Sequence, residues 1–303
     1  MYNKNMTPKI CLFYITLRCN ATCEFCGIWR EYQNNSITEI TDLTEITSKL
    51  RQLRRAGIET LEITGGEPLL VDKLPQILKT AKDLELKTVL TTNCILYPDR
   101  YRELKGLTDT LYFSLDYPIA EGHDRSRGLA CFNTVLRSIN YAHEIGENPV
   151  IYYTLKRDSV LYLPEMVELA EKLKVRVFLN PVYDFKGLHG FEKDTYAYIK
   201  YYARNKIVEV NLAALSFLAA GGNNPVWPRC HARQTVVTLL PDLRSASPCF
   251  YNQGGRQGRE AVCSGCTRWP YMLPSFSVGL DKYRWLNWYS KVIEYRKNQG
   301  GKT

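Results

Sequence analysis

Three cysteines stand close together near the start of the chain, and their spacing predicts a metal centre. Cys19, Cys23 and Cys26 follow the pattern C-x3-C-x2-C, so three thiolates can converge on one inorganic cluster from a single loop. A [4Fe–4S] cube has four corner irons, and three thiolates leave one iron open for a reactive ligand. Tetrahedral zinc is the alternative, although the x3 spacing and the lack of a nearby fourth ligand count against a closed zinc site.

A second motif follows about 40 residues later, and together the two resemble a known family. The run Cys19–Cys26, with an aromatic residue directly before the third cysteine, is similar to the signature of the radical S-adenosylmethionine (SAM) enzymes. The run Gly65–Pro68 looks like the GGEP motif of that family. Both motifs come in the family's order, each after a predicted strand. The resemblance implies that the cysteines hold a [4Fe–4S] cluster and that SAM chelates its open iron.

The residues of both motifs have expected roles around SAM. Gly65 and Gly66 let the backbone approach the methionyl amine, because neither has a side chain in the way. Glu67 contributes to the same amine site or fixes the loop, with a helix N-terminal charge as the alternative, and Pro68 stiffens the loop. Phe25 packs near the adenine in the family; simple core packing is its alternative.

Polar residues at the ends of later predicted strands are further candidates for SAM contacts: Ser114, Asp116, Arg127, Thr154 and Asn180. Arg127 can pair with a carboxylate in bidentate fashion. A structural ion pair with Asp116 or Asp124 explains it equally well. Thr154 and Asn180 are equally well explained as caps of their strands.

Cys94 is a candidate catalytic residue, because it follows Asn93 at the end of the third predicted strand. There its thiol could donate a hydrogen atom to a substrate radical. A buried thiol without a role is the alternative. Cys11 and Cys131 fall on apolar stretches and are expected in the core.

A second group of cysteines lies near the C-terminal end: Cys230, Cys249, Cys263 and Cys266. The first two flank a predicted hairpin, and the last two form a C-x2-C pair. The arrangement resembles the twitch domain, a shortened SPASM domain, and implies one auxiliary [4Fe–4S] cluster on all four thiolates. A structural zinc with the same ligands is the alternative. The sequence departs from the family pattern at Leu243, where a glycine is usual.

The elements that must position these residues are alternating strands and helices. Strands are predicted at 10–16, 60–64, 87–91, 110–115, 150–155 and 175–179, each rich in Val, Ile, Thr and Tyr. Apolar residues at helical spacing predict the helices between them, with Leu43, Ile46, Leu50 and Leu53 in the first. Such βα units form a parallel sheet with helices outside. The resemblance implies a partial (β/α)6 TIM barrel over residues 1–222, followed by a small α+β auxiliary-cluster domain over residues 223–303.

Composition places the 303-residue chain among ordinary globular proteins, with 45% hydrophobic and 23% charged residues. The net charge of +9 favours an anionic partner. No motif supports nucleic acid, and an acidic flavodoxin or ferredoxin reductant accounts for the charge. No apolar run approaches the roughly 18 residues of a membrane span, and the polar N-terminus is unlike a signal peptide. We therefore expect a cytoplasmic protein, in which ten cysteines stay reduced.

The resemblance implies a radical SAM enzyme of oxidoreductase or transferase type. It would cleave SAM reductively to a 5′-deoxyadenosyl radical and abstract hydrogen from a small-molecule, lipid or peptide substrate, assisted by the auxiliary cluster. Adenosyl transfer to an alkene or lipid, as in hopanoid-type members, is one alternative. An Fe–S electron carrier or a zinc-stabilised binding protein is the non-enzyme alternative.

Overall fold

The computed structural model describes residues 7–30, 37–182, 191–224, 230–246 and 263–299, and within them nine strands form one sheet. The strands are β1 (Ile10–Thr16), β2 (Thr60–Gly65), β3 (Lys87–Thr92), β4 (Thr110–Ser114), β5 (Val150–Leu155), β6 (Arg176–Pro181), β7 (Val208–Glu209), β8 (Val236–Leu239) and β9 (Ser245–Ala246). Their order across the sheet is β7-β6-β5-β4-β3-β2-β1-β8-β9. Every neighbouring pair is parallel except β8 and β9. The predicted open parallel barrel is confirmed by this order.

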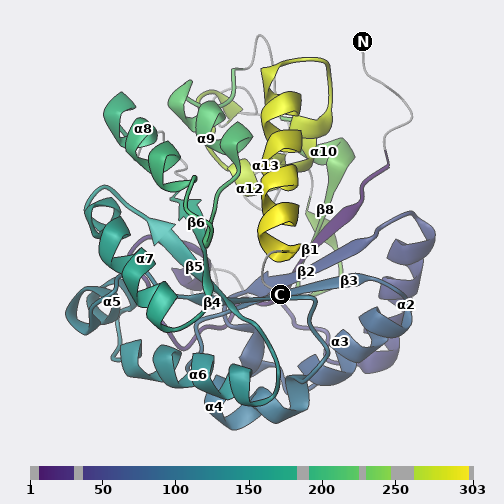
Figure 1. Ribbon diagram of the computed structural model, residues 1–303. Coiled ribbons are helices and arrows are strands. Elements are labelled where there is room, and N and C mark those ends of the chain that lie inside the picture. Colours follow the sequence, from purple (N-terminus) through teal and green to yellow (C-terminus); the bar gives the residue numbers. More distant parts are fainter. Residues whose placement is uncertain (1–6, 31–36, 183–190, 225–229, 247–262, 300–303) are drawn as a thin grey trace.

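Helices cover both sides of the sheet. The described helices are α2 (Leu43–Arg55), α3 (Leu74–Asp83), α4 (Tyr97–Arg100), α5 (Ala120–Arg127), α6 (Phe132–Glu144), α7 (Leu163–Lys172), α8 (Lys193–Tyr202), α9 (Leu212–Ala219), α10 (Ala232–Thr235), α12 (Trp269–Met272) and α13 (Lys282–Gln299). Short 3-10 turns are η1 (Pro68–Leu70), η2 (Tyr101–Leu104), η3 (Ser159–Tyr162) and η4 (Pro274–Ser277). Figure 1 shows α2, α3, α4, α6 and α7 on the outer side, and α9, α12 and α13 on the opposite side. The C-terminal segments therefore cover the side that a closed barrel would enclose.

The local sequence explains why the first βα unit forms. Asp42 caps the start of α2 by accepting a hydrogen bond from the Thr44 backbone N–H at 2.6 Å. Ile46, Leu50 and Leu53 recur at helical spacing and are buried against the sheet. The helix predicted from this spacing is confirmed.

Strand β2 shows the alternation that separates the two faces of the sheet. Leu61 and Ile63 are fully buried towards the helices, whereas Thr60, Glu62 and Thr64 are only partly buried and face the other side. The inner side of this strand is thus polar. The predicted strands agree with β1 to β5 within one residue at each end, and β6 ends two residues later than expected.

The predicted C-terminal hairpin is present and joins the barrel. Strand β8 pairs in parallel with β1, with Ile10 opposite Val236, and β9 returns antiparallel to β8. Leu243 lies in the turn with φ 60°, a left-handed conformation that glycine adopts at little cost. The glycine expected at this point from the family pattern would avoid that cost. Among the described residues, no helix is long and apolar enough to cross a bilayer.

Candidate active site

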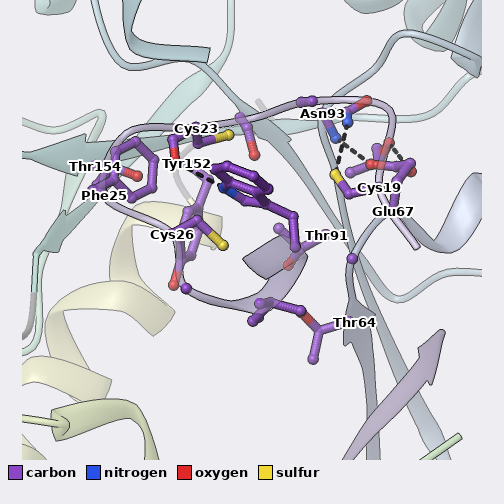
Figure 2. A pocket seen from close by; sticks show the side chains of 18 of the residues that line it. Cys19, Cys23, Phe25, Cys26, Thr64, Glu67, Thr91, Asn93, Tyr152 and Thr154 are labelled. Atoms are coloured by element: carbon purple, nitrogen blue, oxygen red, sulfur yellow. Dashed lines mark hydrogen bonds between the residues drawn. The ribbon is translucent and has the colours of Figure 1, made fainter. Parts of the chain in front are cut away.

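A cleft of about 210 Å³ lies at the carboxyl ends of the barrel strands, and all three cysteines of the N-terminal motif line it (Figure 2). Eight of the ten residues expected to contact SAM also line this cleft: Phe25, Gly65, Gly66, Glu67, Ser114, Arg127, Thr154 and Asn180. The two motifs are therefore brought together in space, as both follow strands whose carboxyl ends share one edge of the sheet. We call this space the cysteine cleft.

The cysteine loop is fastened to the end of α5. The backbone N–H of Thr22 donates to the Arg127 carbonyl at 3.1 Å, and that of Glu24 donates to the Ser126 carbonyl at 3.1 Å. Gly128 ends the helix with φ 74°, and a Cβ at that position would meet Thr22 Oγ1 at 2.2 Å. A glycine at this helix end therefore permits the close contact that holds the loop.

The three thiols are held in a dry environment. Burial raises the pKa of Cys19 to about 12 and also raises the pKa of Cys26. Asn93 Nδ2 lies 3.9 Å from Cys19 Sγ and donates to Asn20 Oδ1 at 2.8 Å. The Cys19 and Cys26 thiols are thus protonated without metal, and iron binding must displace their protons.

The geometry of the thiols suits a cluster. Among the described residues, no three His, Cys, Asp or Glu side chains lie close enough together to hold a single metal ion. A [4Fe–4S] cluster accepts one thiolate for each iron, so its ligands need not meet at one point. The three thiols of Cys19, Cys23 and Cys26 therefore fit a [4Fe–4S] cluster with one open iron.

The two motif glycines allow the two motif loops to pack against each other. A Cβ on Gly65 would lie 2.1 Å from the Thr16 carbonyl oxygen, and a Cβ on Gly66 would lie 1.9 Å from the Arg18 carbonyl oxygen. The Gly66 backbone N–H donates to the Thr16 carbonyl at 2.8 Å. Close packing against the end of β1 is thus a second reason for glycine here, besides the expected approach to the methionyl amine.

Glu67 is fully engaged in fixing its own loop. It is 1% exposed, and one carboxylate oxygen accepts from Leu69 N at 3.0 Å and Thr92 Oγ1 at 2.7 Å. The other accepts from Asn93 N at 2.8 Å. Glu67 also caps the start of η1. The structure therefore contains two of the roles expected for this residue: it fixes the loop, and it places a negative charge at the start of a short helix. Burial raises the pKa of this carboxyl group.

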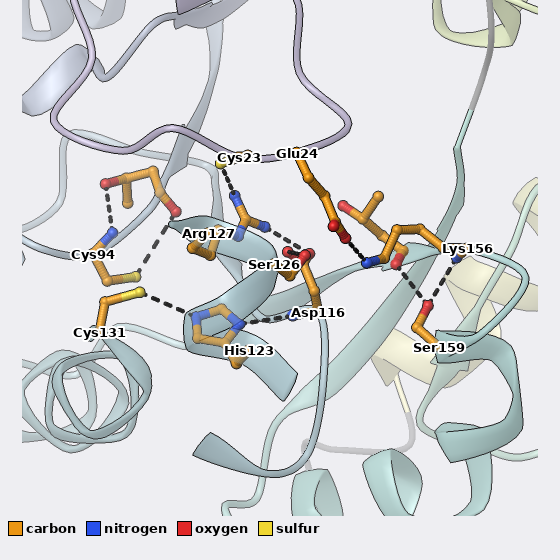
Figure 3. Close-up of polar contacts among 12 residues, drawn as sticks. Cys23, Glu24, Cys94, Asp116, His123, Ser126, Arg127, Cys131, Lys156 and Ser159 are labelled. Carbon is orange, nitrogen blue, oxygen red and sulfur yellow. Dashed lines mark hydrogen bonds and ion pairs between the residues drawn. The ribbon is translucent and has the colours of Figure 1, made fainter. Parts of the chain in front are cut away.

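Arg127 forms the structural ion pair that the sequence left as an alternative. Its Nη2 donates to Asp116 Oδ1 at 2.6 Å, and Ser126 Oγ donates to Asp116 Oδ2 at 3.1 Å (Figure 3). The guanidinium also lies 5.4 Å from the centre of the Phe25 ring. Asp116, the acidic partner in this ion pair, is fully buried and does not line the cleft. Its position therefore does not support the expected contact of Asp116 with SAM.

Two buried polar atoms on the cleft wall lack partners within the described part of the chain: Arg127 Nε and Asn180 Oδ1. Because a buried polar atom without a partner is costly, such atoms point to a polar ligand. SAM has an ammonium group and hydroxyls that can donate, and a carboxylate that can accept. The residues present therefore fit both the cluster and SAM.

Two other candidates lie outside the cleft lining. Pro68 is buried at the first turn of η1, consistent with a role in stiffening the loop. Cys94 is 0% exposed, has φ 69°, and its Sγ donates to the Thr92 carbonyl at 3.8 Å. This placement favours the alternative expected for Cys94, a buried thiol without a catalytic role.

The cleft also has lining residues that the sequence motifs did not indicate: Trp29, Glu62, Thr64, Thr91 and Asn93. Trp29 Nε1 donates to the Cys23 carbonyl at 3.2 Å and so covers the loop. Thr64 and Thr91 lie near the ends of β2 and β3. Alternation along each strand was the available signal, because the residues at every second position face the same side.

The second cysteine group is organised around one asparagine. The Asn223 side chain accepts from the Cys230 backbone N–H at 3.1 Å and donates from Nδ2 to the Cys263 carbonyl at 3.2 Å. Its backbone N–H donates to the Cys266 carbonyl at 2.9 Å. Asn223 is 4% exposed. One buried residue therefore joins the backbones of three of the four cysteines, and Cys249 lies outside the described residues.

Comparison with known proteins decides the family. The sequence profile described as "Radical SAM superfamily" matches residues 13–170, just over half of the chain, and this range contains both motifs. The chain belongs to the radical SAM superfamily. It is therefore an enzyme of a family that uses a [4Fe–4S] cluster, SAM and an electron donor.

Two curated relatives illustrate the range of this similarity. A probable GTP 3′,8-cyclase of Methanococcus maripaludis is 31% identical over 163 residues, covering 52% of this chain and 54% of that protein. A PqqA peptide cyclase of Granulibacter bethesdensis is 22% identical over 302 residues, covering 86% of this chain and 80% of that protein. The chain thus spans about half the length of the first relative and most of the second.

The fold is similar to that of a solved radical SAM protein. The crystal structure of Streptococcus suis SuiB bound to S-adenosylmethionine aligns with a TM-score of 0.65 at 18% identity, over 83% of this chain and 60% of that chain. At this identity the likeness shows a shared fold. It agrees with the partial barrel that the sequence predicts.

Proposed function

We propose that this radical SAM enzyme cleaves SAM reductively in the cysteine cleft and abstracts a hydrogen atom from a substrate bound inside the barrel. One observation supports this most directly: Cys19, Cys23 and Cys26 line the same cleft as Gly65 and Gly66. When bound, the cluster and SAM supply an electron and a 5′-deoxyadenosyl radical. The protein's own part is to bind, orient and exclude water.

The cleft walls provide polar groups for SAM at several strand ends. Asn180 Oδ1 is a buried acceptor without a described partner, and it suits the ammonium group. Ser114 and Thr154 bring hydroxyls from β4 and β5, at 6% and 3% exposure. Arg127 brings positive charge beside the loop, although Asp116 already neutralises much of it. Backbone groups at Gly65 and Gly66 complete the set that we propose for SAM.

Aromatic side chains surround these polar groups and would keep water from a reactive radical. Phe25, Trp29 and Tyr152 line the cleft from the cysteine loop and from β5. Excluding water protects a radical intermediate from side reactions. Aromatic rings at this point therefore suit the proposed chemistry.

We also propose an auxiliary [4Fe–4S] cluster on Cys230, Cys249, Cys263 and Cys266. The bonds from Asn223 to three of these residues support the proposal, because ligands of a cluster need fixed backbones. Such a cluster would accept an electron from the substrate radical. A flavodoxin or ferredoxin would deliver the first electron, and the net charge of +9 suits such acidic partners.

The test is oxygen-free loading with iron and sulfide, followed by dithionite and SAM. We expect 5′-deoxyadenosine, measured by mass spectrometry, and about eight irons for each chain when both sites hold cubes. Cys19→Ala should abolish 5′-deoxyadenosine. Cys11→Ala is the matched control, because Cys11 is a fully buried thiol on β1 that does not line the cleft. A loaded protein that makes no 5′-deoxyadenosine refutes the proposal, and about four irons refutes its auxiliary cluster.

A further inference from the structure

Glu62 lies where two cavities meet inside the barrel. A wider cavity of about 840 Å³ adjoins the cysteine cleft and is lined by the N-terminal halves of the strands and by segments of α12 and α13. Three residues line both spaces: Glu62, Tyr152 and Pro270. On β2, Glu62 pairs in register with Leu12 of β1 and Val89 of β3. Its side chain is thus at mid-strand, between the proposed SAM site and the wider cavity.

This carboxyl group has no partner among the described residues, and it differs in this from three of the other acidic groups nearby, whereas Glu294 at the α13 side of the cavity is exposed to solvent. Glu59 pairs with Lys9 at 2.6 Å, Glu209 pairs with Arg176, and Glu67 accepts three hydrogen bonds. Glu62 makes no hydrogen bond and no ion pair within the described part of the chain, and burial alone raises its pKa to about 7. A carboxylate that lines a cavity without a counter-charge favours a cation brought to it.

Aromatic rings surround the same space. Tyr112, Tyr152, Phe178 and Trp269 all line the wider cavity. The Tyr152 and Phe178 rings are stacked with centres 5.4 Å apart, and Tyr112 lies 5.2 Å and 5.5 Å from them. Trp269 lies 6.1 Å from Phe178 and is held by donating from Nε1 to the Pro181 carbonyl at 2.9 Å. Aromatic faces attract organic cations, so the rings and the carboxylate favour the same ligand.

Five basic residues line the wider cavity, and none of them forms an ion pair with Glu62 within the described part of the chain: Lys9, Lys87, Arg284, Lys291 and Lys297. Lys87 is exposed at the start of β3. It pairs in register with Thr60, which lies two residues before Glu62 on β2 and therefore nearer the N-terminal edge of the sheet. Lys9 is engaged with Glu59, and Lys297 donates to three carbonyls, those of Ala203, Asn205 and Val208. Arg284 donates to the Gly279 carbonyl at 3.3 Å, and Lys291 is exposed. The carboxyl group of Glu62 therefore keeps no counter-charge among the described residues.

We propose that Glu62 binds a cationic, amine-bearing group of the substrate at the junction of the two cavities, with the aromatic cluster packed around it. The inference rests on the proposed function for the place of SAM, and it deepens that function by naming an organic amine as the substrate class. An ammonium or guanidinium held at mid-strand would bring the neighbouring carbon atoms towards the cysteine cleft. A polyanion such as a nucleoside triphosphate would instead be repelled by the unpaired carboxylate.

Three probes that differ in charge test this inference: 2-phenylethylamine, the neutral 2-phenylethanol and the anion 3-phenylpropionate. Binding is measured by calorimetry at pH 8.5 on the cluster-loaded protein with SAM, under anaerobic conditions. We expect the amine to bind at least about tenfold more tightly than the alcohol, a difference of about 1.4 kcal/mol. Glu62→Gln should remove this preference. Glu59→Gln is the matched control, because it removes an equal charge from the rim of the same cavity, and its affinity should stay within about twofold.

The inference fails if the alcohol or the acid binds the wild-type protein as tightly as the amine, or if Glu62→Gln binds the amine unchanged. Glu62→Asp keeps the negative charge and should therefore retain part of the preference for the amine. If Glu62→Asp and Glu62→Gln both lose all binding, the cause is misfolding and not the missing charge. The proposed function is judged by a separate readout, 5′-deoxyadenosine formed without any amine. A protein that forms it but ignores charge retains the proposed function alone. A protein that selects the amine through Glu62 but forms none retains the cation site alone.

Discussion

The Nη1 atom of Arg127 donates a hydrogen bond to Cys23 Sγ at 3.6 Å (Figure 3). The same guanidinium is 7% exposed and pairs with the fully buried Asp116. One cation is therefore shared between a carboxylate and a thiol of the cysteine loop. Since a hydrogen bond to a ligating sulfur stabilises negative charge on it, Arg127 is placed to influence a cluster as well as the fold.

Arg127→Met should destabilise the protein by about 3 kcal/mol, because it leaves the Asp116 carboxylate buried without its partner. The measurement is urea unfolding of the metal-free protein. The double variant Asp116→Asn with Arg127→Met should recover part of this loss, since no unpaired charge then remains. Equal stability of the single and double variants would show that the ion pair is not what Arg127 contributes.

Gly66→Ala should prevent iron loading at the N-terminal motif. The added Cβ would lie 1.9 Å from the Arg18 carbonyl oxygen, which is backbone and cannot rotate away. The loop before Cys19 would have to move. Iron analysis and the cluster absorption after reconstitution measure the effect.

Gly106→Ala is the control for this substitution. Gly106 has φ 72°, so alanine costs about 1 kcal/mol there, but no atom lies within 4 Å of the added Cβ. It should load iron normally. Normal loading of Gly66→Ala would contradict the packing argument.

Asn223→Ala should lower the iron content from about eight to about four atoms for each chain, because the side chain joins Cys230 to Cys263. Asn211→Ala is matched to it: Asn211 caps α9 by accepting from the Ala214 N–H at 2.9 Å and touches none of the cysteines. That variant should lose stability without losing iron. If both variants retain about eight irons, Asn223 does not position the second cysteine group.

Glu62→Gln should stabilise the ligand-free protein at pH 8 by about 3 kcal/mol, and the difference should vanish below pH 4.5. The folded pKa of Glu62 is about 7, above its ordinary value of 4.5. The stability associated with the neutral carboxyl group is therefore fully present below pH 4.5 and is lost as the pH rises through 7. Thermal unfolding of both proteins at pH 4.5 and pH 8 measures it. A constant difference across this range would contradict a raised pKa.

The sequence predicted the barrel well, because its signals are local. Ile46, Leu50 and Leu53 repeat at helical spacing, and β-branched runs mark the strands that β1 to β6 confirm. The two motifs were correctly expected at one end of the sheet, since parallel strands align their carboxyl ends. The sequence could not decide which carboxylate pairs with Arg127, because SAM and Asp116 explained the arginine equally well. The structure forms the Arg127–Asp116 ion pair between the segment after β4 and the end of α5, and no local pattern encodes that contact.

Other site features depended on contacts across long stretches of chain. Nothing in the sequence marks Asn223, because its role arises only when residues 230, 263 and 266 come together. Glu62 was detectable in part. It breaks an apolar strand at an inward position beside Leu61 and Ile63, and its lack of a partner needed the structure.

The position of β1 between β2 and β8 has a consequence for how the protein is made. Ribosomes synthesise β1 first, but its second neighbour, Val236–Leu239, emerges more than 200 residues later. Until then one edge of β1 has no strand beside it. The cysteine loop that follows β1 is therefore not yet packed in its final surroundings. Insertion of iron and sulfide should therefore follow the emergence of β8, when the strand order on both sides of β1 can assemble.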